Sequence, residues 1–212
     1  MTDFDLDAAL ERAIAEPRTR RAEVLRAAES LFAKRGFAAV RIRDVAQLAA
    51  VNSATVHLHW KSKAILYEAV CRLHAKQLLR FVDGAGLSTG DRPMADAIGD
   101  MIEFLASHPH IAPLALQSVA DQSPPELPSL FSHDVSAFRF VEKAVRDRSP
   151  DDAEAVEPIL TVLTVFYFAA VAFCDSPLQR ALLGGSVYHD AEVRGRVAHF
   201  ASSLASRLVD AS

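Results

Sequence analysis

The chain has 212 residues, 50% of them hydrophobic and 24% charged, which is the composition of a globular protein with ample length for a buried core. The formal net charge of −4 excludes attraction to nucleic acid through overall charge. The charge is uneven, however: residues 19–63 hold nine Lys or Arg and three acids, whereas residues 81–212 hold nine basic and eighteen acidic residues. A small basic segment ahead of a larger acidic one indicates that the N-terminal part meets phosphate.

Residues 1–18 carry five acids and no apolar run, so we expect no signal peptide. Their apolar spacing allows a short amphipathic helix, but Pro17 separates it from the next predicted helix, and both an ordered arm and a frayed tail remain open. Cys71 and Cys174 lie far apart in apolar helical patterns, which predicts two buried thiols and favours a reducing, cytoplasmic location. The uncharged residues 158–174 are interpreted as a core helix, because Pro158 begins them and acids flank both ends.

Apolar residues recur at helical spacing almost throughout, and strand signals are nearly absent, which predicts an all-α fold of about nine helices. The first helix is expected to end at Gly36, a residue suited to a left-handed terminus. Helices are predicted at 20–35, 42–49, 53–60, from 63 onward, and at 94–107, 110–121, 127–147, 151–175 and 190–209.

The segment 42–60 combines two short helices with a short turn, the pattern of a helix-turn-helix. Its small and apolar residues Val45, Ala46, Ala49, Val51 and Val56 are expected to face inward, and Asn52 is placed to cap the second helix. Such a helix enters the major groove of DNA, where its outer polar groups meet base edges. The polar groups on or near that surface are Asn52, Ser53, Thr55, His57 and His59, followed by Lys61 and Lys63 where a phosphate backbone would run.

Residues 19–66 resemble the tetracycline-repressor (TetR) family of bacterial transcription regulators. The resemblance depends on Arg20-Arg21, on the segment from Leu31-Phe32 to Gly36-Phe37, and on residues 51–63. It implies that Arg43 and Thr55 contact the groove, that His57 takes the place of a phosphate-contacting tyrosine, and that His59-Trp60 forms an aromatic pair before Lys61. Lys63 resembles a lysine that binds backbone phosphate. The predicted DNA-binding residues are Arg41, Ile42, Arg43, Asn52, Ser53, Thr55, His57, His59, Trp60, Lys61 and Lys63.

Three positions depart from the family pattern. Ala50 stands where the turn usually has Gly, so a positive φ there would cost about 1 kcal/mol. Arg41 replaces a usual Ser or Thr cap, and His57 replaces a tyrosine with a titratable group whose contact strengthens at acidic pH.

The resemblance implies an N-terminal arm at 1–18, a helix-turn-helix domain at 19–65, and a ligand-binding and dimerisation domain at 66–212. Aromatic density in the last of these favours an apolar or aromatic ligand, although such residues also build cores. The candidate pocket residues are Phe81, Phe104, Gln117, Asp121, Phe138, Phe166 and Phe173. The last helix carries apolar positions that supply either half of a dimer interface or the closure of the monomer core: Val193, Val197, Phe200, Ala201, Leu204 and Leu208.

We therefore expect a ligand-responsive transcriptional regulator, a repressor by family habit, that binds a palindromic operator as a homodimer and is released by its ligand. An enzyme is the first rival, but the chain shows no Gly-rich phosphate loop, nucleophile elbow or helical Glu-x-x-His pair. We predict no catalytic residue, metal or cofactor; His108 and His110 fit solvated positions at a turn. The second rival is a helical bundle that binds protein instead of DNA.

Overall fold

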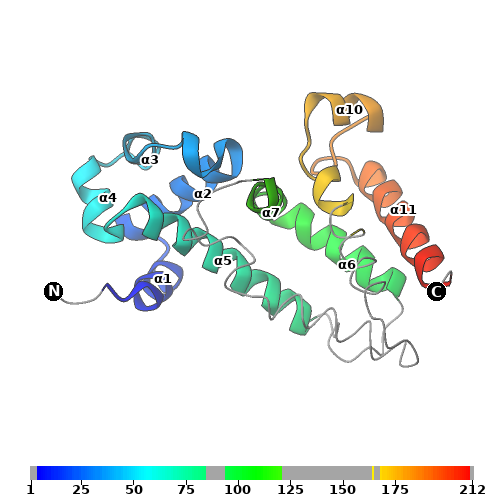
Figure 1. Cartoon of the computed structure of the whole chain (residues 1–212), viewed down its shortest axis with the longest axis horizontal. Helices are drawn as coiled ribbons and strands as arrows, with labels where there is room; N and C mark the ends of the chain where they lie inside the picture. Colours follow the sequence, from blue (N-terminus) through cyan, green and yellow to red (C-terminus); the bar gives the residue numbers. More distant parts are fainter. Residues whose placement is uncertain (1–3, 85–93, 121–163, 165–167, 211–212) are drawn as a thin grey trace. The chain divides into compact units, whose positions relative to one another are not determined.

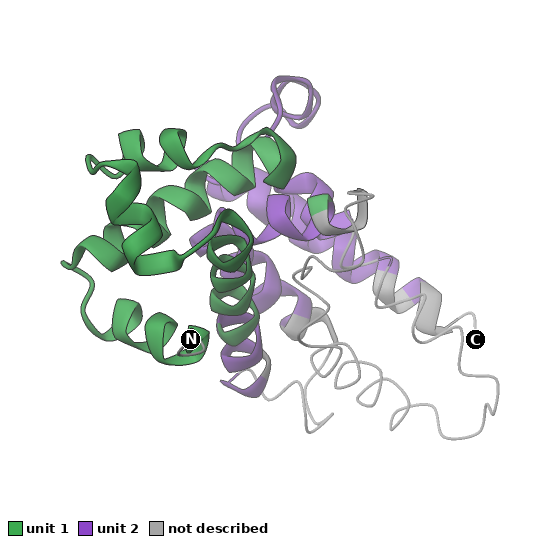
Figure 2. Ribbon diagram, turned by 60° about the vertical axis from the view of Figure 1, so that its left-hand side comes forward, with its two compact units in different colours: residues 1–76, 117–133 green, residues 77–116, 134–212 purple. Residues whose placement is uncertain are grey.

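The computed structural model describes residues 4–84, 94–120, 164 and 168–210. All of the regular structure in these ranges is helical, which confirms the predicted fold class (Figure 1). No helix within them combines the length and the apolar character needed to cross a membrane. The chain divides into two compact units, residues 1–76 with 117–133 and residues 77–116 with 134–212, so α5 (Lys63–Gly84) and α7 (Ile111–Ala120) each contribute to both (Figure 2).

The N-terminal arm is an ordered helix, α1 (Leu6–Ala15), in the first unit. Asp5 caps it by accepting a hydrogen bond from the backbone N–H of Ala8 at 2.9 Å. Leu10 is fully buried, and Asp7 pairs with Arg72 of α5 at 2.8 Å. These contacts settle the choice between an ordered arm and a frayed tail in favour of the arm.

The second helix, α2 (Arg20–Ala39), begins at its cap Thr19 and is interrupted at Gly36, where φ is +73°. The predicted helix end is thus confirmed as a break in helical geometry, after which one further turn of helix is present. Glycine is favoured here because a Cβ is strained at this φ.

The next two helices are short: α3 (Ile42–Leu48) and α4 (Ser53–Trp60), joined by a tight turn. Within the turn, the N–H of Val51 donates to the carbonyl of Ala46 at 2.9 Å. Ala50 has a φ of +52°, so the strain expected from the missing glycine is present.

The core of the first unit forms where α2 and α5 meet. Phe32 packs edge-on against Tyr67 with ring centroids 5.1 Å apart, and Phe37 approaches the same tyrosine at 5.1 Å. His74 is the buried polar residue of this region, and its Nε2 lies 3.1 Å from Oε1 of Glu29 on α2. Apolar packing and one buried polar pair therefore join the two helices.

In the second unit, α6 (Met94–Ser107) and α11 (Ala191–Asp210) run side by side (Figure 1). Ile98, Ile102 and Leu105 form the buried stripe of α6 at spacings of four and three. The short helix α10 (Pro177–Leu183), absent from the sequence prediction, is capped by Ser176 and ends at Gly184 in the left-handed conformation. Of the two cysteines expected to be buried, Cys71 is buried and Cys174 is exposed.

The turn before α4 offers a test of its strain. Replacing Ala50 by Gly should raise the free energy of unfolding by about 0.5 to 1 kcal/mol, because relief of the left-handed alanine outweighs the added freedom of glycine in the unfolded chain. Urea denaturation followed by circular dichroism measures the change. The adjacent Ala49, with φ of −80°, is the matched control: Ala49→Gly should destabilise the protein by about 0.5 to 1 kcal/mol. If both variants destabilise the protein, the positive φ of Ala50 is not a source of strain.

Candidate nucleic-acid interface

The helix α4 has one buried and one exposed face. Val56 and Trp60 are buried, whereas Ser53, Ala54, His57 and Leu58 are exposed on the other side. The exposed side chains lie between the N-cap of the helix and its last turn, which is the region that a helix-turn-helix presents to base edges.

Trp60 does not belong to the exposed surface, which corrects the prediction that it contacts DNA. Its side chain is 0% exposed, and its indole Nε1–H donates to the backbone carbonyl of Arg21 at 3.2 Å. A buried tryptophan with a satisfied N–H is a core residue. It ties the C-terminal end of α4 to the first turn of α2.

The first turn of α4 is held by its own polar side chains. Asn52 Oδ1 accepts hydrogen bonds from the backbone N–H of Thr55 at 2.8 Å and from the Thr55 hydroxyl at 2.9 Å. The predicted cap is therefore present. Both side chains are engaged within the helix, although Ser53 beside them is exposed.

The last turn is closed by His57, whose Nδ1 lies 3.0 Å from the backbone carbonyl of Lys61. A carbonyl oxygen only accepts, so Nδ1 carries the proton and donates. In the neutral ring, Nε2 is then an acceptor and is repelled by a phosphate oxygen. Protonation turns Nε2 into a donor, so His57 gains a phosphate contact only as a cation.

His59, in the last turn of α4, is half-buried. Burial lowers the pKa of its imidazole, and the nearby Arg21 guanidinium lowers that pKa further. His59 therefore stays neutral to more acidic pH than an ordinary histidine.

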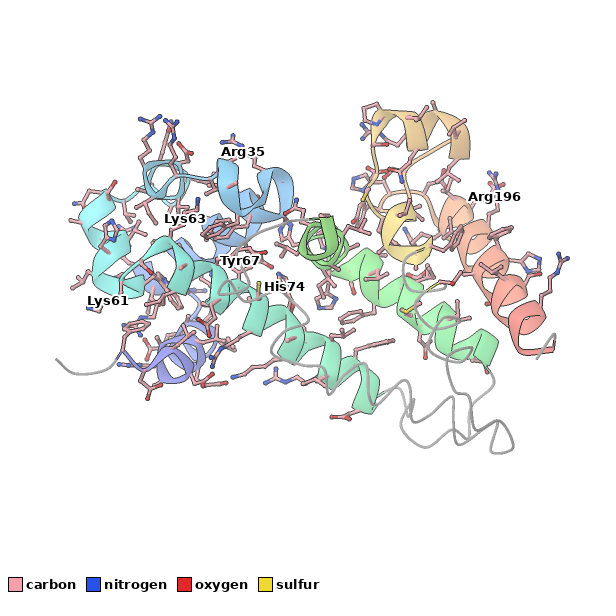
Figure 3. The ribbon with its side chains drawn as sticks, viewed as in Figure 1. Arg35, Lys61, Lys63, Tyr67, His74 and Arg196 are labelled. Atoms are coloured by element: carbon pink, nitrogen blue, oxygen red, sulfur yellow. The ribbon has the colours of Figure 1, made fainter. Side chains whose placement is uncertain are left out.

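The two lysines after α4 differ in their surroundings, and both are labelled in Figure 3. Lys61 is exposed, has a φ of +56°, and places Nζ 5.9 Å from the ring centroid of Phe4. Lys63 is half-buried: its Nζ lies 4.1 Å from the centroid of the Phe37 ring and 3.4 Å from the carbonyl of Ala38, and burial lowers its pKa. Lys61 is thus the more available cation, and Lys63 also has a structural role.

The start of α3 supplies two further exposed cations, Arg41 and Arg43. The guanidinium of Arg41 has donors only and cannot cap the helix; instead, Asp44 accepts the Arg41 backbone N–H at 3.0 Å. The Arg43 side chain is largely exposed, with a loose 3.7 Å approach to Asp44. Ile42 between them is half-buried.

One exposed residue of α4 was missed by the sequence analysis, which searched this helix for polar groups. Leu58 is 67% exposed. Its position two residues from both buried anchors, Val56 and Trp60, was the available signal, because residues two apart on a helix point in different directions.

The predicted ligand residues are only partly brought together. In the second unit, Phe81 and Phe104 stack with centroids 4.5 Å apart beside an open hollow of about 470 Å³ that Arg80 and Asp100 also line. Phe173 is fully buried and packs edge-on against Tyr188. Asp121, Phe138 and Phe166 lie outside the described residues.

Gln117 belongs to the first unit. Its side-chain amide donates to the carbonyl of Ala33 on α2 at 2.8 Å, which gives the amide a packing role there. Its assignment to the ligand pocket stays a prediction.

The predicted dimer stripe of α11 also needs correction. Val193 and Val197 are each 4% exposed and Ala201 is fully buried within a single chain, because this stripe packs against α6. It closes the core of the second unit, as the alternative interpretation held. Phe200 is 55% exposed and Leu204 is half-buried, whereas the side chain of Leu208 lies outside the described part.

One segment of the chain matches a known family. Residues 24–70 match the model of the bacterial regulatory proteins of the tetR family. The HTH-type transcriptional repressor KstR2 of Mycolicibacterium smegmatis is 40% identical over 57 residues, which cover 27% of this chain and 28% of that relative's length.

Two solved structures share the fold over nearly their full lengths. One, from Streptomyces coelicolor and assigned as a transcriptional regulator, has a TM-score of 0.64 and 17% identity over 88% of this chain and 98% of its own. The other, assigned to the TetR family and from Mesorhizobium loti, has a TM-score of 0.60 and 13% identity over 99% of this chain and 98% of its own. The segment that contains the helix-turn-helix of α3 and α4 therefore matches the tetR family of bacterial regulatory proteins over residues 24–70, and the fold is shared with a solved structure assigned to the same family.

Proposed function

We propose that the protein is a ligand-responsive repressor that binds a palindromic operator as a homodimer. The observation that carries this proposal is the exposed outer face of α4, which lies inside the family-matched residues 24–70 together with the exposed cations Arg43 and Lys61. In this proposal residues 19–65 bind DNA, and residues 66–212 hold the effector and the dimer contacts. The curated relative is named a repressor, which supports that direction of regulation.

In the proposed complex, different parts of α3 and α4 contact the bases and the phosphates of DNA. The outer face of α4 meets base edges in the major groove, while cations at both ends of the motif, Arg41 and Lys61 among them, meet phosphates on either side. In a dimer, the two helix-turn-helix motifs would contact half-sites separated by about one helical turn of DNA or a multiple of it.

For the effector, we propose an apolar or aromatic small molecule bound in the second unit. The stacked Phe81 and Phe104 beside the 470 Å³ hollow support this class, because flat aromatic faces favour apolar, planar ligands. A ligand that binds more tightly to a dimer conformation unsuited to the operator would release DNA by linkage.

One prediction from the proposed function concerns salt. A duplex selected from a random-sequence library should bind tightly, and its affinity should fall about 10³-fold between about 50 mM and about 200 mM salt if about six phosphates are neutralised per dimer. Fluorescence polarisation measures both properties. Lys61→Ala should weaken binding to all sequences and reduce the salt slope by about one per contacted phosphate.

The matched control is Arg207→Ala, which removes an exposed cation from α11 and should leave the salt slope unchanged. The same assay tests the effector: an apolar or aromatic compound that releases the duplex should lose potency on Phe104→Ala. Recovery of no preferred duplex would overturn operator binding and favour a protein-binding bundle.

Another prediction concerns the dimer. With the Val193 stripe buried against α6, we place the dimer contact on the outer side of α11 around the exposed Phe200. Phe200→Asp should shift the protein from dimer to monomer in analytical ultracentrifugation at micromolar concentration, because it puts a charge into an apolar contact. Circular dichroism should show an unchanged fold, and a variant that remains dimeric would exclude this surface.

A further inference from the structure

The outer face of α4 is apolar at its centre. Leu58 is 67% exposed, and Ala54, exposed one turn earlier, lies on the same side of the helix. The two buried anchors of the helix, Val56 and Trp60, point away from this side. In the described part of the first unit, the large apolar side chains that are more than half exposed are Leu48 of α3 and Leu58 of α4, and Leu58 lies on the helix that a helix-turn-helix places in the groove. Its aliphatic surface is therefore available for contact in a complex.

The polar side chains that flank Leu58 are partly engaged within the helix itself. Thr55 bonds to Asn52, and His57 donates to the carbonyl of Lys61. Their capacity to read donors and acceptors on bases is therefore reduced, and the aliphatic surface carries a larger share of the contact area.

The major groove offers a chemical match to such a surface. Among the base edges there, thymine alone presents an apolar group, its C5-methyl, and aliphatic side chains contact it. We propose that Leu58 is a specificity-determining residue that contacts the C5-methyl group of one thymine in each half-site. This inference rests on the proposed operator binding. DNA is the occupant assigned to this face because Arg43 and Lys61 on the same motif complement its phosphates.

The experiment removes the methyl group without altering base pairing. In the duplex selected from a random library, each thymine of the major-groove face is replaced in turn by deoxyuridine, symmetrically in both half-sites, and affinity is measured by fluorescence polarisation. One position is expected to lose about four-fold per half-site, the value of one methyl group removed from water.

Leu58→Ala should bind the thymine and uracil duplexes equally at that position while keeping the salt dependence of the wild type. Because Leu58 is exposed, the variant should melt as the wild type does. Leu178→Ala is the matched control, since Leu178 of α10 is 68% exposed, and it should retain the discrimination.

The possible outcomes separate the two proposals. A preferred duplex whose affinity is indifferent to uracil at every position overturns the role of Leu58 and leaves operator binding intact. Discrimination that survives in Leu58→Ala also overturns it, because another side chain then contacts the methyl group. A library from which no preferred duplex is recovered overturns operator binding and this inference together.

Discussion

The burial of Trp60 is the interaction on which the proposed DNA-binding surface depends. The helix α4 has eight residues, and a helix of this length is not stable in water without tertiary contacts. Its indole fills the space under the last turn and donates to the Arg21 carbonyl, so the orientation of α4 is fixed relative to α2. An isolated recognition helix would have neither the fold nor the direction needed to enter a groove.

This anchoring explains how one short helix serves both the core and the surface. Its inner side carries Val56 and Trp60, and its two ends are closed locally, by Asn52 at the start and by His57 at the finish. The outer side, which exposes Ala54 and Leu58, is not needed to hold the helix in place. The residues that hold the helix and those that meet its ligand are therefore distinct except at His57, where one ring nitrogen closes the helix and the other faces outward.

Local rules predicted much of the first unit from sequence. The break at Gly36, the Asn52 cap and the positive φ of Ala50 each follow from the conformational preferences of one residue and its immediate neighbours. What failed was the direction of side chains. Trp60 is buried because it packs against α2, and the Val193 stripe is buried because α11 packs against α6. In both cases the partner helix is distant in sequence. Leu58 was overlooked for a related reason, since a search for polar contacts passes over an exposed leucine.

The charge of residues 19–63 differs in sign from that of residues 81–212. Residues 19–63 carry six more basic than acidic residues, whereas residues 81–212 carry nine more acidic than basic. Because charges are screened over about 8 Å at physiological salt, the cations of residues 19–63 dominate the field next to that segment, where the proposed complex places DNA. The acidic remainder in turn disfavours contact between its own surface and phosphate. The net charge of −4 is therefore compatible with DNA binding, and the uneven distribution favours encounters in which α4 faces the duplex.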